Sequence, residues 1–89
     1  MSRYRAAIAT APSGELAFAI AHMTPDGPVL DVVRVMIVAG GEAGIDAVYR
    51  GLRAQGIEVR DCRPTWPAGR SGDVRARAIA DALEMAAAQ

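Results

Sequence analysis

Apolar residues alternate with polar or small residues through the first quarter of the chain. In residues 3–10 and 15–23 every second position is apolar, which is typical of β-strands. In the second segment Leu16, Phe18 and Ile20 share one face, and alanines occupy the other. We expect this alanine face to be shallow enough for a helix to lie close against it.

Turn residues separate these segments from a third one. A Pro-Ser-Gly run occupies residues 12–14, and Thr-Pro-Asp-Gly-Pro occupies residues 24–28. Residues 29–38 are rich in β-branched side chains and apolar on both faces toward the end, which predicts a central strand covered on both sides. Three strands joined by short turns predict an antiparallel meander.

The apolar period then changes from two residues to about 3.6. Residues 42–55 carry one apolar stripe, formed by Ile45, Val48, Tyr49 and Leu52. Gly56 stands where a helix-ending residue belongs. Residues 57–60 alternate again and predict a short fourth strand, which a strand–helix–strand crossover would place parallel to the third.

The last third of the chain predicts a loop and a helix. The loop covers residues 63–72, and the helix covers residues 73–87, with Ser71 or Asp73 as its cap. Its expected buried side comprises Val74, Ile79, Ala82, Leu83 and Ala86. The order β-β-β-α-β-α predicts an α/β fold, a four-stranded mixed sheet with two helices, in one domain spanning residues 1–89.

Charge, apolar runs and cysteine content limit the classes of function that the chain can have. Ten arginines balance ten acidic residues, so the chain has no net charge that would attract nucleic acid or anionic membranes. No apolar run approaches the roughly 20 residues of a membrane span, and the N-terminus does not resemble a signal peptide. The single cysteine, Cys62, forms no internal disulfide. These features predict a cytoplasmic protein without a membrane partner.

Several short motifs resemble one family. Ala-Pro-Ser-Gly occupies residues 11–14, Ala-Ile-Ala-His occupies 19–22, and Leu-Asp-Val-Val-Arg occupies 30–34. Arg60-Asp61 then precedes a loop that contains a tryptophan. Over residues 4–67 the chain resembles the ribonuclease H-like nuclease domain of phage terminase large subunits. The resemblance implies a minimal ribonuclease H-like sheet.

The same resemblance implies that catalysis is lost. The family's nucleases hold two divalent metals between clustered carboxylates, and the first of these ligands corresponds here to Ala11, which cannot bind a metal. Asp61 is the one remaining candidate ligand. We therefore expect no enzyme activity and no metal or other cofactor. The predicted function is a phage- or prophage-related interaction protein, such as a small inhibitor of a host system. A metal-dependent nuclease-like module or a nucleic-acid-binding module is the alternative.

Two surfaces are candidates for binding. One is the loop near residues 63–71, where arginines accompany a tryptophan between prolines; its candidate binding residues are Arg60, Arg63, Trp66 and Arg70. Arginine and tryptophan favour either protein contacts or nucleic acid. The other is an open sheet edge, which invites strand addition by a protein partner or homodimerisation.

Other reactive side chains have structural explanations. His22, the only histidine, shares a strand face with Leu16, Phe18 and Ile20 and is expected to be a hydrogen-bonded core histidine. Cys62 is expected to be a small hydrophobe, and Gly40, Gly41 and Gly44 are expected to form a tight turn.

Overall fold

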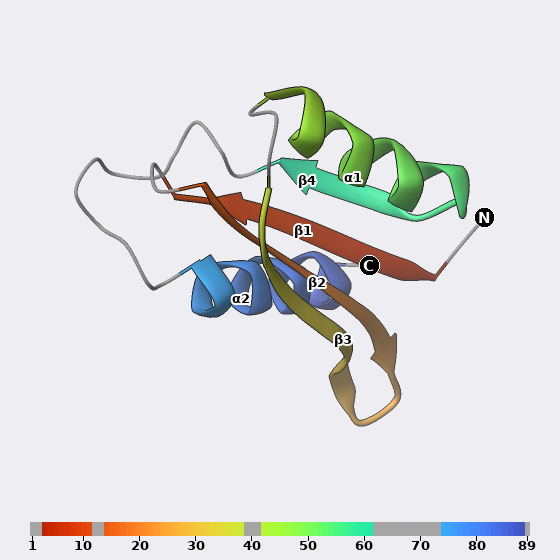
Figure 1. Cartoon of the computed structure of the whole chain (residues 1–89). Helices are drawn as coiled ribbons and strands as arrows, with labels where there is room; N and C mark the ends of the chain where they lie inside the picture. Colours follow the sequence, from red (N-terminus) through yellow and green to blue (C-terminus); the bar gives the residue numbers. More distant parts are fainter. Residues whose placement is uncertain (1–2, 12–13, 39–41, 62–73, 89) are drawn as a thin grey trace.

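The computed structural model describes residues 3–11, 14–38, 42–61 and 74–88, without the side chains of Glu42 and Asp61. The elements follow the predicted order β-β-β-α-β-α (Figure 1). They are β1 (Tyr4–Thr10), β2 (Glu15–Thr24), β3 (Gly27–Ile37), α1 (Glu42–Ala54), β4 (Glu58–Asp61) and α2 (Val74–Ala87). All four strands belong to one mixed sheet, which confirms the predicted fold class.

The strand order in the sheet is β3-β2-β1-β4. β1, β2 and β3 form the predicted antiparallel meander. β4 pairs in parallel with β1, so that Arg5 lies beside Glu58 and Ile8 beside Asp61. β4 therefore runs in the same direction as β3, as the crossover predicted, with β2 and β1 lying between the two strands.

α2 packs on an alanine-lined face of the sheet. From β1 and β2 this face presents Ala7, Ala9, Ala17, Ala19 and Ala21, all fully buried. Ala78, Ala82 and Ala86 of α2 meet them. Because methyl side chains occupy both surfaces, helix and sheet approach closely, as the alanine pattern predicted. Met85 and Val74 add the bulkier side chains at the ends of this layer.

α1 packs on the opposite face, mainly over β4 (Figure 1). The buried centre of this layer comprises Ala6, Ile8, Leu16, Leu52 and Ile57. The predicted stripe of α1 points toward it, because Ile45, Val48, Tyr49 and Leu52 all belong to this cluster. Gly56 ends the helix with φ +78° and donates its amide to the Arg53 carbonyl at 2.9 Å, as expected of a C′ glycine.

β3 lies at the edge of the sheet and not at its centre. Every residue of this strand is exposed or half-buried. The prediction of a doubly covered strand is therefore wrong. Residues with apolar side chains on both faces suit a buried strand, but the local pattern does not reveal which neighbours the strand finds.

Candidate interaction surface

Large apolar side chains are exposed along β3. The exposed large hydrophobic residues of the described part of the chain are Met23, Val29, Val32, Val35 and Ile37. Four of these five belong to β3, and Ile37 is 73% exposed. Single exposed hydrophobic residues are ordinary, whereas their concentration on one strand makes that strand a candidate interaction surface. We call the outer side of Gly27–Ile37, with these four side chains, the β3 edge.

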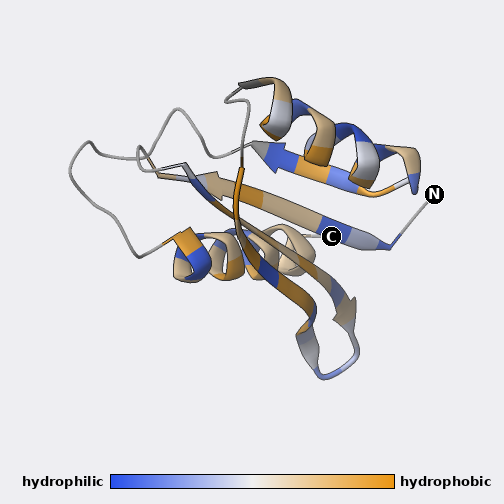
Figure 2. Ribbon diagram, in the orientation of Figure 1, coloured by the Kyte–Doolittle hydropathy of each residue, from blue (hydrophilic) through white to orange (hydrophobic). Residues whose placement is uncertain are grey.

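The two helices cover this strand unequally. α2 reaches β3 on one face, where it half-covers Leu30 and Val33. α1 lies over the other end of the sheet, and the β2–β3 hairpin projects away from both helices (Figure 1). Figure 2 shows hydrophobic colouring along much of β3, interrupted by hydrophilic positions. The side chains of β3 are thus available on both faces of the sheet.

The backbone of β3 is available as well. The amide of Val38 donates to the carbonyl of Gly14 at 3.0 Å, so it points toward β2. Because backbone groups alternate in direction along an antiparallel strand, Ile37, Val35 and Val33 turn their N–H and C=O groups outward. At the other end Pro28 follows Gly27, the residue that closes the hairpin with Thr24. The same alternation turns Pro28 outward, where its missing N–H removes no bond to β2.

A β-bulge interrupts β3 near its middle. Val32 pairs with Ile20 and Leu30 pairs with Ala21, which leaves Asp31 as an extra residue. Asp31 and its neighbour Val32 therefore both face the α1 side of the sheet, where Oδ2 of Asp31 lies 2.7 Å from Nδ1 of His22.

His22 is held on several sides. Besides Asp31, its ring meets the Tyr4 ring in an edge-to-face arrangement with centroids 5.4 Å apart. The guanidinium of Arg3 lies over the Tyr4 ring, 5.4 Å from its centroid. Its hydrogen bond to the Tyr4 hydroxyl raises the pKa of Arg3 above its usual value. The expected hydrogen bond of His22 and its position on the Phe18 face are confirmed, but His22 is half-buried and belongs to neither apolar core cluster.

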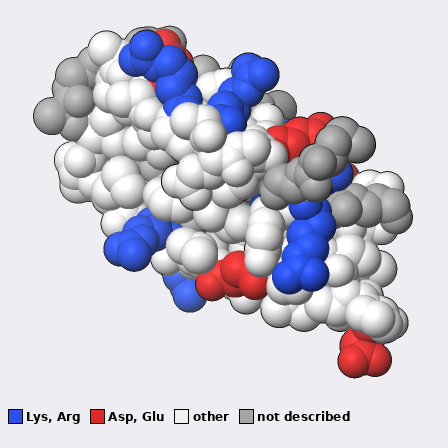
Figure 3. Space-filling view, turned by 90° about the vertical axis from the view of Figure 1, so that its right-hand side faces the viewer, with Lys and Arg blue, Asp and Glu red and all other residues white. Residues whose placement is uncertain are grey.

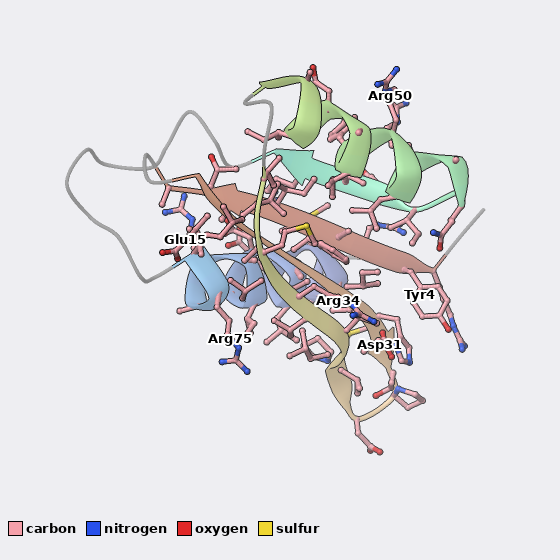
Figure 4. All side chains as sticks on the ribbon, in the orientation of Figure 1. Tyr4, Glu15, Asp31, Arg34, Arg50 and Arg75 are labelled. Atoms are coloured by element: carbon pink, nitrogen blue, oxygen red, sulfur yellow. The ribbon has the colours of Figure 1, made fainter. Side chains whose placement is uncertain are left out.

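Arg34 shares a face with Asp31. It pairs with Phe18 in the β2–β3 register, and Phe18 lies on the same side of the sheet as His22. Arg34 is exposed and forms no ion pair with any residue that the structure describes. Figure 4 shows Tyr4, Asp31 and Arg34 in the same region of the sheet. The β3 edge therefore carries one acid, already bonded to His22, and one base that has no partner within the described residues.

The predicted Arg–Trp site is only partly within the structure. Arg63, Trp66 and Arg70 lie outside the described residues, as do Cys62 and the pair Gly40 and Gly41. Arg60 is described, and its Nη1 lies 3.4 Å from Glu84 Oε1 on α2. Figure 3 shows acidic and basic side chains intermixed over one face of the molecule. The described surface thus gives Arg60 an acidic neighbour instead of a basic patch.

The candidate metal position, Asp61, lies at the end of β4. Pairing places Asp61 beside Ile8 in β1, three positions before Ala11. The Ala11 methyl is buried in the α2 layer. Among residues 3–11, 14–38, 42–61 and 74–88 no three metal-binding side chains of the His, Cys, Asp or Glu type come together.

Two shallow hollows lie at the β4 side. The larger, about 420 Å³, is lined by α1 and β4, and Arg53 covers the Tyr49 ring there at 5.6 Å. The smaller, about 240 Å³, contains Arg5, whose Nε is 3.0 Å from Glu58 Oε2. Because charged or aromatic neighbours already engage these arginines, neither hollow presents a distinct ligand site.

Sequence reasoning missed the β3 side chains as a surface, although it considered an open edge. The available signal was Pro28, the second residue of the strand, because proline within a strand favours an edge position. Comparison with family models, curated proteins and solved structures found no match to this chain. The resemblance to terminase nucleases therefore stays a prediction. No helix among the described residues is long and apolar enough to span a membrane.

Proposed function

We propose that this chain is a non-catalytic interaction module that binds a protein partner by strand addition at β3. One observation carries the proposal: β3, an edge strand of 11 residues, combines outward backbone groups with four exposed large apolar side chains. In strand addition the backbone supplies affinity through a continued hydrogen-bond ladder, and alternate side chains supply specificity.

Both parts of this recognition mode are available. Val33, Val35 and Ile37 offer three consecutive outward positions, which a partner strand can meet with paired N–H and C=O groups. The exposed side chains lie on both faces, with Val32 on the α1 side and Val35 on the α2 side. A partner strand would therefore cover apolar surface above and below the sheet, which adds the hydrophobic contribution that backbone bonds alone lack.

The proposal that the chain is non-catalytic rests on how few carboxylates occupy the positions that correspond to a nuclease metal site. A two-metal nuclease needs several acidic oxygens around one point. Ala11 contributes a methyl group where the resemblance calls for the first acid, and Asp61 is paired beside Ile8. Together with the resemblance, this favours a phage- or prophage-related protein that retains the sheet of the nuclease domain but lacks the carboxylates needed for metal-dependent cleavage. An inhibitor of a host system is one role that such a module could fill.

The proposal is tested by removing one outward amide. Val35→Pro deletes an N–H that does not bond to β2, whereas Val35→Thr keeps the N–H and a β-branched shape. Partners are captured from cells that carry the gene, identified, purified and titrated against each folded variant. We expect Val35→Pro to weaken binding at least about tenfold and Val35→Thr to weaken it much less. Unchanged binding by a folded Val35→Pro variant contradicts the proposal.

The nuclease alternative has its own test. The chain is incubated with DNA or RNA in Mg²⁺ or Mn²⁺ beside an Asp61→Asn variant. Cleavage by the unmodified chain that disappears in the variant would overturn the non-catalytic proposal. Binding to nucleic acid that weakens steeply with salt and with changes at Arg63, Trp66 and Arg70 would favour the nucleic-acid-binding module.

A further inference from the structure

We infer that β3 of a second copy of this chain occupies the β3 edge, antiparallel to the first about a twofold axis at Val33. The two four-stranded sheets would then form one continuous sheet of eight strands. This inference rests on the proposed function, because it names the strand that is added. It follows from the way that the two halves of β3 complement each other.

The backbone groups of β3 match themselves in this register. Outward positions alternate as Pro28, Leu30, Val33, Val35 and Ile37, with the bulge residue Asp31 accounting for the wider step in the middle. Centring the pair at Val33 puts Val33 opposite itself, Val35 opposite Leu30 and Ile37 opposite Pro28. Each outward-pointing N–H or C=O group of one strand therefore meets an outward-pointing group of the other. Pro28 has no N–H, so one donor per strand is missing from this ladder.

The side chains match as well. A twofold axis perpendicular to the sheet keeps each residue on its own face, as direct pairing requires. On the α2 side, exposed Val35 and Ile37 meet Leu30 and Pro28 of the other copy. On the α1 side, Met36 meets Val29. The register thus covers the exposed side chains from both ends of β3 at once.

Charge favours the same register. Arg34 of one copy comes opposite Val32 and the adjacent Asp31 of the other, on the α1 side of the sheet. Oδ2 of Asp31 is engaged by His22, and the charge of Asp31 also acts on Arg3. Within the described residues no hydrogen bond reaches the other oxygen of Asp31, which leaves it open to Arg34 of the other copy. Symmetry repeats the contact, so each dimer contains two such pairs. A register centred at Val35 would instead put Arg34 beside Met36 and leave Val29 uncovered.

Reversing these charges tests the inference. The Arg34→Asp chain carries acids at both positions, and the Asp31→Arg chain carries bases at both. Analytical ultracentrifugation of each folded variant should give a dimer Kd at least about tenfold weaker than that of the unmodified chain. Mixing the two variants should restore dimers, because both contacts then join opposite charges. Arg50→Asp, an exposed change on α1 (Figure 4), is the matched control and should dimerise normally.

Cross-linking tests the register independently. In a Cys62→Ser background, Val33→Cys should form an intermolecular disulfide under mild oxidation, because paired Cα atoms lie within disulfide reach. Val35→Cys should not, because the two residues would lie roughly 13 Å apart or more along the strands. Efficient cross-linking at residue 35 alone, no dimer at any concentration, or no recovery on mixing would overturn the inference. The chain could also be monomeric and bind a different protein, with Val35→Pro weakening that binding. In that case the proposed function would be supported and the dimer would be refuted.

Discussion

The His22 imidazole and the Asp31 carboxylate meet across the β2–β3 pairing, with Nδ1 2.7 Å from Oδ2. Asp31 is the extra residue of the bulge, so this contact ties the irregular point of β3 to its regular neighbour. The bulge also sets the spacing of the outward backbone groups along the β3 edge. A side-chain pair on one face therefore contributes to the geometry of the surface that we propose for binding.

The bulge contact should have a measurable effect on stability. Asp31→Ala removes the partner of a half-buried imidazole and should lower the free energy of unfolding by about 1 kcal/mol. Urea denaturation provides the measurement. Asp26→Ala, at the exposed tip of the same hairpin, is the control and should have a smaller effect. Equal losses for the two variants would show that the His22 contact contributes nothing specific.

The alanine layer beneath α2 should tolerate no larger side chain. Ala82 is 0% exposed and faces the sheet alanines, so Ala82→Leu should push helix and sheet apart and cost about 1–3 kcal/mol, or more. Ala80 is exposed on the same helix, and Ala80→Leu should change stability by less than about 0.5 kcal/mol. Urea midpoints compare the two. A neutral Ala82→Leu would mean that the layers are looser than described.

Two glycines of the α1 region should respond to alanine with opposite signs. Gly56 has φ +78°, which strains any residue with a Cβ, so Gly56→Ala should destabilise by about 1 kcal/mol. Gly51 is exposed within the helix, and a Cβ there would meet nothing within 4 Å. Gly51→Ala should therefore stabilise by up to about 1 kcal/mol. Thermal unfolding of both variants checks the sign, and a stabilising Gly56→Ala would refute the helix-ending role.

Divalent metal should bind weakly. One carboxylate leaves Mg²⁺ or Mn²⁺ mostly hydrated, so titration should shift the amide signals near Asp61 little and without saturation at millimolar concentrations. The Asp61→Asn chain should behave almost identically. Saturable binding below roughly 1 mM that disappears in that variant would indicate further ligands around Asp61 and would revive the nuclease alternative.

Local patterns predicted the elements well because each depends on neighbouring residues. The apolar stripe through Ile45 and Leu52 marked α1, and Gly56 marked its end. The small side chains of β2 predicted that a helix could approach closely, and α2 does so through Ala78 and Ala82. Local spacing also places an ion pair on α2, where Arg77 Nε lies 2.9 Å from Oδ2 of Asp81, four residues later.

The position of β3 could not be predicted in the same way. Strand order depends on pairing between segments that are distant in the sequence. Apolar β-branched residues such as Val32 and Val35 are equally suited to a covered strand and to an edge strand with an exposed apolar surface. The bulge at Asp31 and its contact with His22 likewise arise from register, which two separate sequence segments determine together. The predicted site around Trp66 stays a prediction, since it lies outside the described residues.

β4 gives the assembly a stopping point. It is only four residues long, and Glu58, Arg60 and Asp61 make three of its four residues charged. Once two β3 strands have joined, the remaining open sides of the sheet are these two short, charged strands, which are poor templates for another chain. Growth would therefore end at two copies instead of continuing into a fibre. A strand that pairs with other chains at one edge of the sheet is thus compatible with a finite assembly.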